Sequence, residues 1–134
     1  MSTSTLKESK TMTANKEIGT FIGKIFSFNS SLKLHHWHIT GDASYARHIA
    51  IDQALEDLLD VIDRLTETSY SVNGNIDIVI PETKNPKDII KHAEEFYAYS
   101  ETQRELFTEA FTQAIIDDLQ EAVQQMLYRL KRLQ

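Results

Sequence analysis

Five side chains able to bind a transition metal recur at helical spacing within about a quarter of this sequence. They are two imidazoles and three carboxylates: His36, His48, Asp52, Asp63 and Glu67. Two pairs among them, His48 with Asp52 and Asp63 with Glu67, are four residues apart, so each pair projects from one helix face. A mixture of imidazole and carboxylate suits Fe(II), Mn(II) or Zn(II), and the excess of carboxylate argues against a closed structural zinc site.

The two pairs lie too far apart on one helix to bind one ion together. The step from Asp52 to Asp63 corresponds to about 16 Å of helix, whereas metal–ligand bonds are about 2 Å long. Both pairs could serve one site if a second copy of the helix ran antiparallel about a two-fold axis, which would give two identical sites per dimer. A solvated charged stripe has the same spacing, and Glu56 and Asp60 lie nearby, so spacing alone leaves the ligand set open.

Apolar residues at steps of three and four predict the helices that position these side chains. His36 continues the apolar stripe of a first helix four residues after Leu32, so we expect it to point into a bundle, towards the next helix. Gly41 should end the first helix, and Asp42 or Ser44 should cap the second. The apolar stripe of the second helix consists of Leu55, Leu58, Leu59, Ile62 and Leu65.

The second half of the chain predicts two more helices after a linker. Residues 70–84 indicate an extended linker packed on the bundle, and Asn85 with Pro86 favours a helix start. One helix from there to the C-terminus would be about 72 Å long, too long for so small a domain, so we expect a break near residues 111–114. The expected helices cover about residues 15–40, 44–69, 86–110 and 115–133.

Composition limits the class of protein. The 134 residues suit one domain, and four Gly and two Pro provide too few turns for an all-β fold. Cysteine is absent, which excludes disulfides and thiol catalysis. The net charge is −6, no apolar run could span a membrane, and the N-terminus lacks the apolar core of a secretory signal. We therefore expect an all-α cytoplasmic protein, with residues 1–14 as a flexible tail and residues 15–134 as one domain.

The order of the candidate ligands resembles the signature of the Dps family of mini-ferritins. That signature has a His-Trp pair followed by an apolar residue and a Gly. A second His comes twelve residues after the first, then an acid four later, Asp eleven on and Glu four after that. The chain matches every step, with Trp37, Ile39 and Gly41 in the first part and the candidate ligands throughout.

The resemblance implies a ferritin-like four-helix bundle that assembles into a hollow homo-oligomer, a dodecamer. It also implies ferroxidase sites for two irons between two-fold-related subunits, with His36, His48 and Asp52 from one subunit and Asp63 and Glu67 from its neighbour. Family members oxidise Fe(II), preferentially with hydrogen peroxide, store the ferric product as mineral and so protect against oxidative damage. Zn(II) or Mn(II) could take the place of iron.

The chain departs from the family pattern in three respects. It is shorter than typical members, residues 70–84 leave limited room for the short helix usual in that connection, and Thr68 stands where the family often has Arg. These departures bear on the dodecamer more than on the site. Trp37 beside a ligand could quench radicals, although core packing is the favoured interpretation. The remaining histidines, expected at the surface, are His35, His38 and His92.

Two other functions stay open at this point. A helical interaction protein could keep the fold without turnover, and a nucleoid protein could protect DNA. Three lysines against one glutamate give residues 1–16 a charge of +2, enough only for weak contact with phosphates at low salt, so a solubilising tail is favoured.

Overall fold

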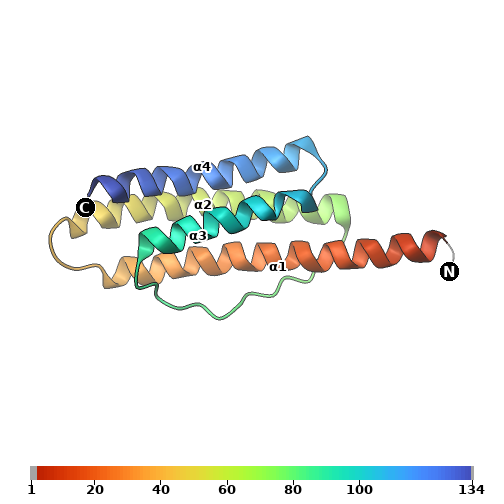
Figure 1. Ribbon diagram of the computed structural model, residues 1–134, viewed down its shortest axis with the longest axis horizontal. Helices are drawn as coiled ribbons and strands as arrows, with labels where there is room; N and C mark the ends of the chain where they lie inside the picture. Colours follow the sequence, from red (N-terminus) through yellow and green to blue (C-terminus); the bar gives the residue numbers. More distant parts are fainter. Residues whose placement is uncertain (1–2, 134) are drawn as a thin grey trace.

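Four α-helices form in the predicted order in a computed structural model that describes the backbone of residues 3–133 and the side chains of residues 12–133. No strand occurs among the described residues, which confirms the all-α class. No helix in this part of the chain is both long and apolar enough to cross a bilayer. The elements are α1 (Thr3–His38), α2 (Ser44–Asn73), α3 (Ile89–Thr102), the 3-10 helix η1 (Arg104–Leu106) and α4 (Ala110–Arg132) (Figure 1).

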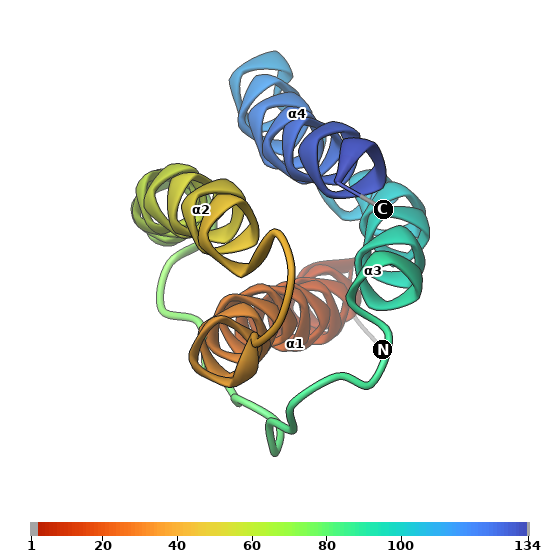
Figure 2. The ribbon, with the colours of Figure 1, turned by 90° about the vertical axis from the view of Figure 1, so that its left-hand side faces the viewer.

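The bundle has one long crossover connection. Helices α1 and α2 are antiparallel, and so are α3 and α4, but residues 74–88 return along the bundle so that α2 and α3 run in the same direction (Figure 1). Viewed along its length, the bundle places α1 beside α2 and α3, and α4 beside α2 and α3 (Figure 2).

The predicted apolar stripes form the core, with one exception. Leu59 is 51% exposed, although the other members of its stripe are buried. It lies roughly 105° around α2 from the centre of the buried face, which packs against α1 and α4. The buried members of the two stripes include Ile18, Phe21, Ile22, Ile25 and Leu32 of α1 and Leu55, Leu58, Ile62 and Leu65 of α2.

The expected tail is helical where the structure describes it. Helix α1 begins at Thr3, so the predicted start at about residue 15 was wrong. Residues 3–14 contain no Gly or Pro to stop a helix, and this end of α1 extends beyond the other helices (Figure 1).

The turn between α1 and α2 differs in its cap from the prediction. Gly41 does follow the end of α1, with a φ of 89°. The N-cap of α2 is Ala43, which has a left-handed φ of 62° and no side-chain cap bond, so neither Asp42 nor Ser44 caps the helix. This tight turn brings the end of α1 and the start of α2 side by side.

Helix α3 starts later than predicted. Its N-cap is Asp88, whose side chain accepts a hydrogen bond from the Lys91 N–H at 3.1 Å. The chain stays outside the helix through Asn85 and Pro86, because the linker continues along α1 to this point.

The break between α3 and α4 falls at residues 103–109, ahead of the predicted break at 111–114. The guanidinium of Arg104 donates to Asp117 at 2.6 Å and to the Gln113 side chain at 2.8 Å. The Gln113 amide donates back to the Arg104 carbonyl at 2.8 Å. This network joins the end of α3 to α4 and satisfies the polar groups of the turn.

The crossover linker lies against two glycines of α1. A Cβ on Gly19 would collide with the carbonyl of Asp77, and one on Gly23 would collide with the carbonyl of Val79. Residues 74–88 therefore lie extended in a groove that only glycine leaves open, as expected for a linker packed on the bundle.

We predict that Gly23→Ala destabilises the protein by about 1–3 kcal/mol, because the new methyl group meets a backbone carbonyl that a side-chain rotation cannot move. Alanine in place of glycine within an unobstructed helix would instead stabilise it by about 1 kcal/mol. Urea denaturation followed by circular dichroism measures the difference, with the exposed neighbour Thr20→Ala as the control. Equal or greater stability of Gly23→Ala would show that the linker does not occupy this groove.

Candidate metal centre

His36 lies near the end of α1 and points towards α2, as predicted. Its Nε2 is 2.9 Å from an Oδ1 atom of Asp52, and its side chain is 14% exposed against 53% for Asp52. Both ring nitrogens of His36 are buried; Nδ1 has no hydrogen-bond partner among the described residues, and the only partner of Nε2 there is this contact with the Asp52 carboxylate. A buried ring nitrogen without a partner, such as Nδ1, costs free energy unless another group binds it.

His48, in the first turns of α2, completes a three-residue cluster with His36 and Asp52. The two imidazole rings meet edge to face, with centroids 4.3 Å apart and planes at 82°. Nevertheless, no group of three or more His, Asp or Glu side chains among the described residues is arranged to hold an ion. One protomer therefore gathers three of the five predicted ligands without forming a complete site.

Asp63 and Glu67 do not join this cluster. Both lie on the exposed surface of α2, and neither has an ion-pair partner among the described residues. Helix α2 is continuous from Ser44 to Asn73, so about 16 Å of rigid helix separates Asp63 from Asp52.

The outward face of α2 combines donors with exposed apolar side chains. At about 100° per residue, the two donor pairs and four apolar residues fall within about 100° of one another around the helix. Sequence reasoning missed this apolar contribution, although the face as a whole, donors and apolar residues together, repeats every three or four residues in the sequence. We call this surface the α2 outer face; it consists of Tyr45, His48, Ile49, Asp52, Glu56, Leu59, Asp63, Glu67 and Tyr70.

Trp37, next to His36, is 65% exposed in the protomer, so the favoured interpretation as core packing was wrong. The Nζ of Lys33 lies 5.7 Å from its ring centroid, on the same helix.

Asp60 is held on a different face of α2. The Arg64 guanidinium donates to Asp60 at 2.9 Å and to Asp118 of α4 at 2.9 Å. Together they line a groove of about 450 Å³ between α2 and α4. Asp60 is thus directed away from His36 and is a poor candidate for the same site.

The remaining histidines are not placed alike. His38 is exposed as expected, with its Nδ1 2.9 Å from the Leu34 carbonyl. His92 is half-buried against expectation, with its Nε2 2.7 Å from the Ser31 hydroxyl, and burial lowers its pKa. His35 is also half-buried.

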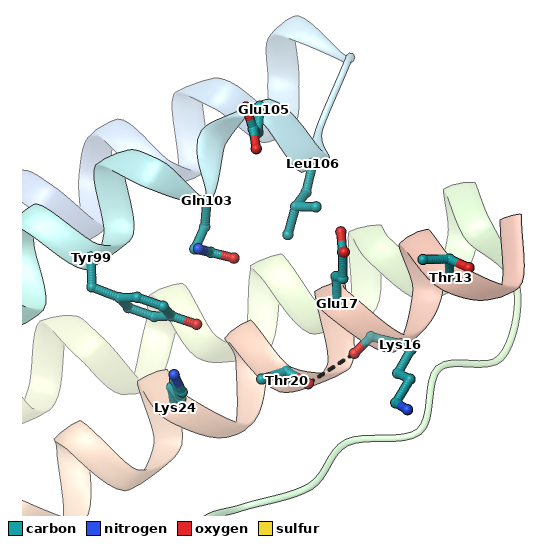
Figure 3. Close-up of a pocket in the computed structure, with 9 residues that line it drawn as sticks. All are labelled: Thr13, Lys16, Glu17, Thr20, Lys24, Tyr99, Gln103, Glu105 and Leu106. Atoms are coloured by element: carbon teal, nitrogen blue, oxygen red, sulfur yellow. Dashed lines mark hydrogen bonds between the residues drawn. The ribbon is translucent and has the colours of Figure 1, made fainter. Parts of the chain in front are cut away.

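A cavity of about 530 Å³ lies away from this cluster, between α1 and the α3–η1 segment (Figure 3). Lys24 Nζ stands 4.4 Å from the Tyr99 ring centroid at its edge, and burial raises the pKa of the Tyr99 hydroxyl. The lining includes no histidine, so this cavity does not provide the imidazole and carboxylate donors of the predicted site.

The profile of a family of unknown function (DUF5856) matches residues 36–130, more than half of the chain. The chain belongs to this family. The part matched to DUF5856 begins at His36 and includes all five predicted ligands. No curated protein matches the chain, and no solved structure matches it. The family has no assigned function.

We predict that Asp52→Asn weakens Co(II) binding by about tenfold or more, because it removes a charged donor beside His36. Asp60→Asn is the matched control on the same helix and should leave the affinity within about twofold, since an exposed ion pair contributes little to the fold. Anaerobic titration followed by the Co(II) absorption bands gives both affinities. An equal loss in the two variants would contradict the assignment.

Proposed function

We propose that this protein is a Dps-like mini-ferritin that oxidises Fe(II) at sites shared by two copies of the chain and stores the ferric product. The observation that carries the proposal is the convergence of His36, His48 and Asp52 from α1 and α2, with Asp63 and Glu67 exposed on the same outward face. The order and spacing of the five residues resembles the Dps signature at every step.

The residue numbers on the α2 outer face support a two-fold arrangement. The midpoint between His48 and Glu67 coincides with the midpoint between Asp52 and Asp63, between residues 57 and 58. Two antiparallel copies of α2 crossing there would place each His48 near Glu67 of the second copy and each Asp52 near Asp63 of that copy. Both half-sites would be completed by one symmetric contact.

The same contact would bury apolar surface. Leu59, 51% exposed, lies close to the proposed axis, and Ile49, 52% exposed, lies near its edge. Tyr45 and Tyr70 are also equidistant from the midpoint, so Tyr45 of each copy would lie near Tyr70 of the other copy. Burial of apolar side chains provides the favourable free energy that a dimer with a carboxylate-rich face requires.

The connectivity of the bundle agrees with the proposal. One long crossover between the second and third helices is the connection found in ferritin-like bundles. Residues 74–88 contain no helix, so the chain departs here from the short helix usual in the Dps family.

The donor set suits oxidation of Fe(II) as a substrate. Carboxylate oxygens favour Fe(III) over Fe(II), and the imidazoles of His36 and His48 are suitable donors to both. A carboxylate from Asp52 or Glu67 could bridge two irons. Each Fe(II) then gives one electron to a shared hydrogen peroxide, which takes up two protons and leaves as two water molecules. A paired two-electron reduction avoids release of hydroxyl radical.

We predict that, after anaerobic loading with Fe(II), added hydrogen peroxide produces ferric absorbance faster in the presence of the protein than in buffer alone. Light scattering should show that the protein is larger than a monomer. His48→Ala and Asp63→Ala should each lower the rate by about tenfold or more, because each removes a ligand from every shared site. Asp60→Ala, on the neighbouring face of α2, is the control and should keep the rate.

Oxidation at the buffer rate in the wild type, or rates unchanged in both ligand variants, would contradict the proposal. That outcome would favour a non-catalytic helical interaction protein with the same fold.

A further inference from the structure

The α2 outer face carries negative charge that one protomer does not balance. Four of its nine residues are carboxylates, and none of the nine is lysine or arginine. Asp52 approaches His36 at 2.9 Å, whereas Glu56, Asp63 and Glu67 have no ion-pair partner among the described residues. These carboxylates are all exposed, so in a separate chain water solvates their charge.

The cations of α2 lie on other sides of the helix. The helix contains no lysine and two arginines. The Arg64 guanidinium is engaged by Asp60 and Asp118, at 2.9 Å each. Arg47 precedes His48 by one residue, so it projects about 100° around the helix from that edge of the face. The negative charge of the α2 outer face therefore has no compensating cation from its own helix.

A symmetric contact between two copies would double this charge. Eight carboxylates would then lie in one interface, four from each chain. Glu56 is one and a half residues from the midpoint of the face, about 2 Å along the helix, so the two copies of Glu56 would lie close to the axis. Juxtaposed like charges oppose association, and the core of a stable homodimer interface is normally depleted of charge. The apolar side chains of this face favour the contact but are few.

The substrate ions of the proposed centre carry the charge that is needed. With two Fe(II) in each of two shared sites, four ions would bring as many positive charges as the eight carboxylates bring negative ones. Donors from one protomer form no group arranged to hold an ion among the described residues, so the ions should prefer the paired chains to the separate chain. A ligand that binds the associated state better than the separate state drives association by mass action.

We propose that divalent transition-metal ions gate this contact: two chains associate through the α2 outer face when Fe(II) is bound between their donor pairs, and stay apart without it. The gate rests on the shared site of the proposed function and adds regulation to it, because loading with substrate and assembly of the site become one equilibrium. By reciprocity, the affinity for the metal rises with the concentration of the chain.

The test is sedimentation velocity of the full-length protein at several concentrations, metal-free and with Zn(II), which has the charge of Fe(II) and no redox chemistry. We expect a monomer without metal, and a dimer dissociation constant that Zn(II) lowers by about tenfold or more. Mg(II) at the same concentration should have little effect, because it prefers oxygen ligands and retains its water.

Glu56→Gln removes the like charges nearest the axis and none of the five predicted ligands. It should strengthen association of the metal-free chains by about tenfold. Roughly 1 M NaCl should act in the same direction on the wild type, because salt screens exposed charges. Glu95→Gln makes the same chemical change at an exposed position of α3, across the bundle from α2 (Figure 2), and should leave association within about twofold.

The gate is overturned if metal-free chains associate as tightly as Zn(II)-loaded chains, a result that leaves the shared site of the proposed function standing. It is also overturned if Glu95→Gln strengthens association as much as Glu56→Gln. A chain that stays monomeric with Zn(II) would overturn both the gate and the shared site. Gated association without Fe(II) oxidation would support the gate and contradict the proposed function alone.

Discussion

The rigidity of α2 determines where the candidate ligands can act. Thirty residues of unbroken helix hold two donor pairs on one face at a fixed separation of about 16 Å. No rotation of side chains brings Asp63 to His48 within one protomer, so a site that used both could only form between chains. The short turn at Ala43 places His36 beside His48 and Asp52, whereas Asp63 and Glu67 remain exposed.

The pattern of exposure around the candidate centre follows from the same constraint. Leu59 and Trp37 are exposed apolar side chains that lie near donors which form no complete metal site among the described residues. An antiparallel second copy would cover these apolar groups and provide the missing carboxylates together. Elsewhere, the Arg104 network fixes the α3–α4 turn, and the glycine groove of α1 holds the linker, so neither connection covers the α2 outer face.

Local periodicity predicted the elements, while tertiary contacts decided their limits. Helical spacing was sufficient to predict α2 and the direction of His36 towards it, because buried residues repeat every three or four positions. It failed at the α3–α4 break, where Arg104 bonds residues more than ten positions away, and at Asp88, which caps α3 after an extended linker. Gly19 and Gly23, four residues apart on α1, are a sequence signal for the linker groove, but an analysis of apolar spacing does not use glycines.

In the proposed centre each site takes ligands from two chains, and subunit mixing measures this. His48→Ala and Asp63→Ala remove ligands from opposite halves, so each variant alone should have no intact site. When equal amounts are co-assembled, half of the dimers are mixed and each mixed dimer regains one intact site, so about one quarter of the wild-type Fe(II) oxidation rate should return. If the co-assembled protein is no more active than either variant alone, the ligands do not come from two chains and the account is wrong.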